Sequence, residues 1–80
     1  MELKEEVLGI ISKTLDIEES EIKEGQKLYD SIGVDSTEMV ELVVAFNKRF
    51  GIKLETNEIT KFSTLNEIVE VINKKEGSLS

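Results

Sequence analysis

Apolar residues recur along this chain at the three- and four-residue spacing of amphipathic helices, and no segment has the alternating pattern of a strand. The first such pattern predicts a helix over residues 3–14. The apolar face of this helix consists of Leu3, Val7, Ile10, Ile11 and Thr14 or Leu15. A long connection with only isolated apolar residues then reaches Asp35. Connections of this length inside a small domain are more often functional than short ones.

The strongest helical pattern begins at Asp35-Ser36 and predicts a second helix that ends before Gly51. Either Asp35 or Ser36 can cap the helix, and Glu38 follows Asp35 at the spacing of a capping box. Gly51 suits the left-handed residue that commonly follows a helix. One face of this helix is expected to form the core: Met39, Leu42, Val43, Phe46 and Phe50.

Two further helices are expected after Gly51. A cap at Thr56 predicts a short third helix that ends near Phe62, and Thr64 with Glu67 forms a capping box for the last helix. The buried stripe of the last helix is Leu65, Ile68, Val69 and Ile72. Residues 76–80 are expected to be a frayed tail. The predicted fold is therefore all-α: a small four-helix bundle of three main helices and a short third one, in a single domain over residues 1–80.

The solvent side of the second helix offers a candidate docking surface. Val40 and Val44 point away from the core stripe, and Glu38 and Glu41 lie near the helix start. Apolar contact combined with charge is typical of a protein-docking face. The sequence equally allows the long loop to cover both valines, since isolated surface apolar residues are common.

Ser36 also has two interpretations. A serine at a helix start is most simply a cap. It can instead present an exposed hydroxyl where free N–H groups and the helix dipole favour a phosphate. Its position in the sequence does not separate the two.

Composition narrows the function. The net charge is −7, from 17 acidic and 10 basic residues, which disfavours nucleic acid and anionic membranes and favours partners with basic surfaces. The chain has no His and no Cys, which excludes a thiolate nucleophile, an imidazole base and a zinc site. Any thiol chemistry must therefore use a prosthetic group. No apolar run can span a bilayer and the first residues do not form a signal peptide, so a cytoplasmic protein is expected.

The segments Gly33-Val34-Asp35-Ser36 and Val40-Glu41-Leu42-Val43, with Phe50 at this spacing, resemble the attachment helix of acyl carrier proteins. The resemblance covers nearly the whole chain. It implies a non-catalytic carrier, with 4′-phosphopantetheine attached to Ser36 by a transferase that uses coenzyme A and a divalent metal. The thiol of this arm would then hold acyl groups as thioesters for fatty-acid, lipid or polyketide-type biosynthesis. Asp35 would help to place the metal or the transferase.

The resemblance also implies a docking face, and the protein is expected to be a monomer. The face that docks on the transferase and on acyl-handling enzymes with basic surfaces would comprise Thr37, Glu38, Val40, Glu41 and Val44. An acyl chain is expected to enter partly among core residues, namely Met39, Phe46, Ile59, Phe62 and Ile68. No residue is expected to bind a resident metal ion.

Some residues depart from the family pattern. Thr37 replaces the usual leucine, Asn47-Lys48-Arg49 replaces residues that are acidic in many bacterial fatty-acid carriers, and Glu55 stands where proline is common. These departures support the hypothesis of a specialised carrier. A peptidyl or aminoacyl carrier and an unmodified acidic interaction domain are the alternatives. A calcium loop from Asp30 to Glu41 is excluded, because apolar residues occupy its ligand positions.

Overall fold

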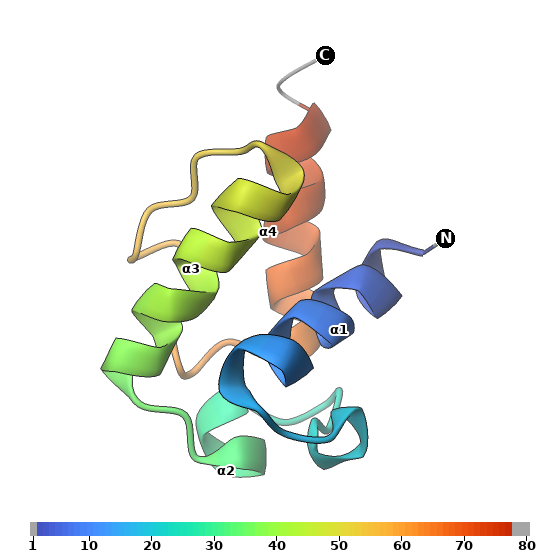
Figure 1. Cartoon of the computed structure of the whole chain (residues 1–80), viewed down its shortest axis with the longest axis vertical. Coiled ribbons are helices and arrows are strands. Elements are labelled where there is room, and N and C mark those ends of the chain that lie inside the picture. The colour runs from blue at the N-terminus through green and yellow to red at the C-terminus, as the bar shows by residue number, and fades with distance from the viewer. Residues whose placement is uncertain (1, 78–80) are drawn as a thin grey trace.

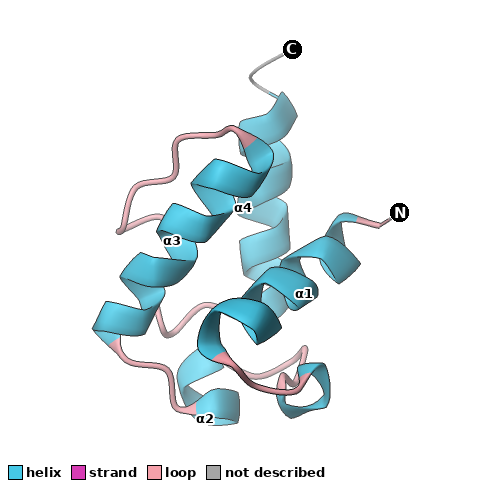
Figure 2. Ribbon diagram, viewed as in Figure 1, coloured by secondary structure: helices cyan, strands magenta, loops and turns pink. Residues whose placement is uncertain are grey.

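The computed structural model describes residues 2–77, which form four α-helices and a short 3-10 turn. The helices are α1 (Leu3–Leu15), α2 (Leu28–Ile32), α3 (Ser36–Phe50) and α4 (Leu65–Gly77), and the 3-10 turn η1 (Glu19–Glu21) lies between α1 and α2. Helix α1 contacts both α3 and α4, and α2 lies at the end from which α3 starts (Figure 1). Residues 2–77 contain no β-strand (Figure 2), so the predicted all-α fold is confirmed.

The core is built from apolar residues at helical spacing, as the sequence pattern predicts. Each main helix contributes a pair of fully buried residues four positions apart: Val7 and Ile11, Leu42 and Phe46, and Ile68 and Ile72. Burying such a side chain stabilises the fold by about 1.5–3 kcal/mol relative to leaving it exposed. The three helices are therefore held together mainly by these facing stripes.

The short helix lies elsewhere than predicted. Residues 56–62 form turns, and the short helix is α2, inside the connection expected to be a loop. Between Thr60 and Ser63, side chains bind the backbone: Oγ1 of Thr60 accepts from the N–H of Phe62, and Oγ of Ser63 accepts from that of Thr60. Such local bonds compete with helical ones, so the predicted third helix does not form.

The long connection is fixed to the rest of the fold at its apolar residues. Ile22, Leu28 and Val34 are buried in the core. The first turn of α2 also binds the segment that precedes α4: the N–H of Leu28 donates to the carbonyl of Ser63 at 3.0 Å, and that of Tyr29 to the carbonyl of Lys61 at 2.8 Å. The residues that lead into α3 are therefore held both by the core and by the segment before α4.

Asn47 has a structural role that the sequence did not predict. Its side-chain oxygen accepts from the N–H of Leu54 at 2.7 Å, and its amide donates to the carbonyl of the same residue at 3.3 Å. This pair fixes the chain just after α3, which Gly51 follows with a φ of 65°. At the other end of the molecule, α4 includes Glu76 and Gly77, two residues of the predicted tail, and residues 78–80 lie outside the described residues.

Candidate functional site

Asp35, and not Ser36, caps helix α3. Its carboxylate accepts from the N–H of Glu38 at 2.8 Å, and the Glu38 carboxylate accepts from the N–H of Asp35 at 3.1 Å. This reciprocal capping box satisfies two backbone donors and is worth about 1 kcal/mol at such a site. The capping interpretation of Ser36 is therefore wrong, because its neighbour already performs that role.

The Ser36 hydroxyl is exposed at the first position of α3, and it forms no hydrogen bond with any of residues 2–77. The N–H groups of Ser36 and Thr37 have no intrahelical acceptor, since they belong to the first turn. A phosphodiester on Ser36 would meet these donors and the positive end of the helix dipole. The residues present thus fit a phosphate-linked group on this hydroxyl.

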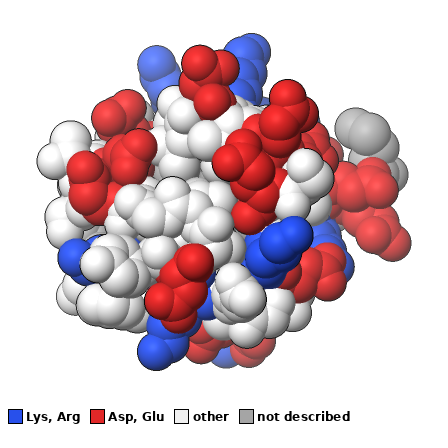
Figure 3. All heavy atoms as spheres, turned by 90° about the horizontal axis from the view of Figure 1, so that it is seen from below, with Lys and Arg blue, Asp and Glu red and all other residues white. Residues whose placement is uncertain are grey.

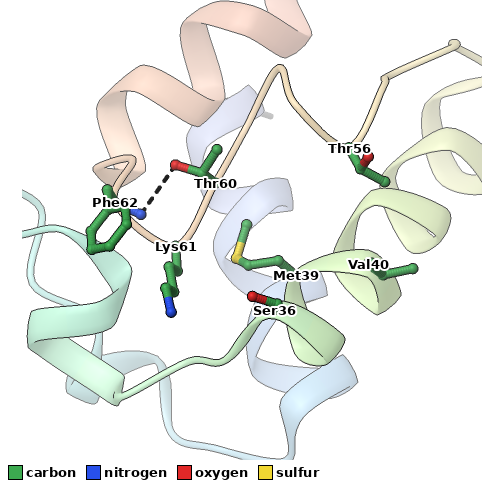
Figure 4. A pocket seen from close by; sticks show the side chains of 7 residues that line it. All are labelled: Ser36, Met39, Val40, Thr56, Thr60, Lys61 and Phe62. Atoms are coloured by element: carbon green, nitrogen blue, oxygen red, sulfur yellow. Dashed lines mark hydrogen bonds between the residues drawn. The ribbon is translucent and has the colours of Figure 1, made fainter.

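A groove of about 400 Å³ adjoins Ser36. Figure 4 shows one wall from α3 and the other from the segment that connects α3 to α4. The lining residues are Ser36, Met39, Val40, Thr56, Thr60, Lys61 and Phe62. The side chains of Ser36 and Lys61 point into the same space, so a group attached to the serine can enter the groove directly.

The predicted acyl-chain residues divide into two groups. Met39 and Phe62 line the groove, while Phe46, Ile59 and Ile68 are almost completely buried in the core. Phe62 was expected in the core, but its side chain is 54% exposed. The reason is that residues 56–62 form turns, so the helical face expected to bury Phe62 does not exist.

Cations and aromatic rings gather beside the groove, and sequence reasoning missed this cluster. The Lys61 ammonium lies 5.2 Å from the centre of the Tyr29 ring and 5.5 Å from that of Phe62. The two rings are 6.0 Å apart, and Lys27 lies 5.9 Å from the Phe62 ring. Lys27 and Tyr29 are more than 30 residues before Lys61 and Phe62 in the sequence, and backbone bonds between α2 and the segment before α4 hold the two pairs side by side.

Glu58 links the segment between α3 and α4, which forms one wall of the groove, to α4. Its carboxylate accepts from the N–H of Glu55 at 2.8 Å and lies 2.9 Å from the Lys75 ammonium. The backbone bond first, and Lys75 second, lower the pKa of Glu58 below its usual 4.5. Because folding lowers this pKa, the stabilisation is present above pH 4.5 and is lost as the pH falls through the lower folded value.

The predicted docking residues lie on one exposed face of α3. Val40 and Val44 are 46% and 53% exposed, so the long loop does not cover them. Thr37 and Glu41 are exposed, whereas Glu38 is half-buried and engaged in the capping box. Figure 3 views the end of the molecule where α2 lies and shows an uncharged area bordered by acidic and some basic side chains.

Residues 2–77 were also searched for metal-binding groups and for membrane-spanning helices. Residues 2–77 contain no group of three or more acidic side chains arranged to hold a metal ion. Within the same residues, no helix is both long and apolar enough to cross a membrane.

The chain is similar to known proteins over most of its length. Residues 5–72 match the family described as "Phosphopantetheine attachment site". The acyl carrier protein of Thermotoga maritima is 41% identical over 76 residues, which cover 95% of this chain and 94% of the relative. The acyl carrier protein of Petrotoga mobilis is 35% identical over 74 residues, which cover 92% and 87%.

Proposed function

The chain belongs to the acyl carrier protein family, and we propose that Ser36 is the residue to which its phosphopantetheine is attached. The family's prosthetic group is 4′-phosphopantetheine, and the protein is a carrier rather than an enzyme. When bound, this group supplies the thiol that a chain without cysteine lacks. The two relatives favour an acyl carrier over a peptidyl carrier or an unmodified interaction domain.

The observation that supports the attachment site best is the division of roles between two neighbouring residues. Asp35 caps the helix, which leaves the Ser36 hydroxyl exposed and without a hydrogen-bond partner among residues 2–77. Lys61 lines the adjoining groove, where its ammonium would offset the charge of a phosphodiester. The groove and the helix start thus offer the arm a place to lie.

The function can be tested by loading the purified protein. Incubation with coenzyme A, Mg²⁺ and a transferase of broad specificity should raise the intact mass by one phosphopantetheine. Subsequent acylation should give an adduct that hydroxylamine removes, as expected for a thioester. A well-characterised carrier in the same tube serves as the control. If only that carrier gains mass, the chain is an unmodified interaction domain.

The acyl chain is proposed to enter the core past Met39, whose flexible side chain can adapt to irregular space. Phe46, Ile59 and Ile68 lie in that core, and Phe62 would contact the chain at the mouth of the groove. A ligand that binds only the folded state raises the melting temperature. The acyl form of the loaded protein should therefore melt above the form with a free thiol. Equal melting temperatures would show that the chain stays outside.

The exposed face of α3 is proposed to dock on the transferase and on acyl-handling enzymes. Its apolar contacts are Val40 and Val44, and Glu41 supplies an exposed charge. Glu41→Lys should lower kcat/KM for modification by about tenfold at low salt, because attraction to a basic partner becomes repulsion. The measurement is the initial rate of mass gain at several salt concentrations, since screening should shrink the effect.

Glu70→Lys is the matched control for this charge reversal. Glu70 is exposed on α4, away from the proposed face, and is paired with Lys74 at 3.5 Å. It should change the rate much less than Glu41→Lys. Equal rates for the two variants would mean that net charge, and not this face, governs recognition.

We propose that the protein acts in the cytoplasm as a monomer, in fatty-acid, lipid or polyketide-type biosynthesis, and that its partner enzymes present basic surfaces to it. The hypothesis of a specialised carrier now depends mainly on Thr37, which lies on the proposed docking face. Lys48 and Arg49 support it less, because they lie in the last turn of α3, at the far end from Ser36.

A further inference from the structure

A second hollow of about 550 Å³ lies between α1 and α3. We call it the basic hollow, and it is lined by Ile10, Lys13, Thr14, Ala45, Lys48 and Arg49. Lys48 is 12 residues after Ser36, or about 18 Å along the axis of α3. The basic hollow is therefore separate from the attachment groove and shares no residue with it.

The basic hollow has positive charge that the described residues do not compensate. The Arg49 guanidinium lies 3.4 Å from the Glu6 carboxylate. Lys13 and Lys48 have neither an ion pair nor a hydrogen bond within residues 2–77. Helix dipoles explain a cation in the last turn of each helix, but they do not explain why two helices bring their cations to one hollow. Two unpaired ammonium groups here are notable in a chain whose net charge is −7.

We propose that the basic hollow binds a short acidic segment of a partner protein. Carboxylates of that segment would pair with Lys13 and Lys48, and an apolar side chain would contact Ile10 and Ala45. A small inorganic anion would leave the apolar part of the lining unused. This inference is independent of the proposed function, since no residue of the attachment groove enters it.

Charge complementarity favours a short segment over a long polyanion. A nucleic acid or an anionic bilayer would extend beyond the basic hollow and meet the many carboxylates of this acidic chain. Exposed charges act on one another within a Debye length of about 8 Å at physiological salt, so that repulsion would be felt at once beyond the rim. Two or three residues of an acidic segment span only about 7–10 Å when extended, so their carboxylates can stay close to Lys13 and Lys48.

Titration of the ¹⁵N-labelled full-length protein tests the proposal. The probe is the synthetic peptide acetyl-Glu-Leu-Glu-Glu-Leu-Glu-amide. Saturable amide shifts are expected in the residues of the basic hollow. Replacing both lysines, Lys13→Gln with Lys48→Gln, should weaken binding by about tenfold, the effect of losing two exposed charge contacts. A peptide with Gln in place of every Glu should give no saturable shifts.

The double variant Lys53→Gln with Lys74→Gln is the matched control, because it changes the net charge equally at exposed cations outside the basic hollow. It should bind like the parent protein. The proposal is overturned if both double variants weaken binding equally, or if no saturable shift appears up to millimolar peptide. It is also overturned if single-stranded DNA or anionic vesicles bind the basic hollow more tightly than the peptide. Concentration-dependent shifts without any probe would assign the basic hollow to a second copy of this chain.

Discussion

Ser36→Ala should abolish attachment of phosphopantetheine while leaving the fold intact. The hydroxyl is the atom to which the phosphate would be joined, so its removal leaves no acceptor at the start of α3. The free energy of unfolding should change by no more than about 0.5 kcal/mol, because the exposed Ser36 side chain forms no hydrogen bond with residues 2–77. Intact mass after incubation with transferase and coenzyme A measures the first effect, and urea denaturation measures the second.

Three control variants sharpen this experiment. Ser31→Ala and Ser63→Ala should still be modified, and peptide mass spectrometry of the parent protein should place the adduct on Ser36. An adduct on either of the other serines would contradict the assignment. Asp35→Ala, unlike Ser36→Ala, should destabilise the fold. Loss of the capping box should lower the free energy of unfolding by about 1 kcal/mol.

Phe46→Ala should have the largest effect on stability among the changes considered. The Phe46 side chain is fully buried and stacked against Phe50, with ring centres 6.4 Å apart. Truncating a buried phenylalanine to alanine costs about 3–5 kcal/mol, from lost burial and the cavity left behind. The total free energy of unfolding of a domain of this size is about 4–12 kcal/mol. Urea denaturation followed by far-UV circular dichroism should therefore show a much lower midpoint.

Phe62→Ala is the same chemical change at an exposed site. Comparing the two variants shows whether the loss of stability comes from burial in the core or from the loss of any aromatic ring. Phe62 is 54% exposed and contacts Tyr29, so its truncation should cost about 1 kcal/mol at most. Similar losses for the two variants would place Phe62 in the core, as its sequence pattern predicts and the structure does not.

The main helices could be predicted because periodicity, caps and core agree. The stripe of Leu42, Val43 and Phe46, the cap at Asp35 and the stop at Gly51 all point to one helix with the observed ends. The segment around Thr60 could not be predicted in the same way. Thr56 resembles a helix cap and therefore indicates a helix that ends near Phe62, but the side-chain bonds of Thr60 and Ser63 to the backbone favour turns.

The candidate site was predictable to the extent that it follows from one helix. The exposure of Val40 and Val44 and the acidic start of α3 come from helical geometry alone, once the covering loop is excluded. The groove is different, because its second wall comes from residues 16 to 26 positions further along the chain. The place of Lys61 beside Tyr29 depends on backbone bonds between α2 and the segment before α4, for which the sequence has no periodic signal.

Those backbone bonds have a consequence for the order of events during synthesis. Leu28 and Tyr29 pair with Ser63 and Lys61, and Lys27 lies opposite Thr64 in an isolated bridge. A nascent chain that has released α3 but not these later residues can expose the serine, yet it has no second groove wall and no partner for α2. The proposed protection of an acyl chain by the groove therefore requires residues 61–64, whereas the Ser36 hydroxyl emerges from the ribosome before them.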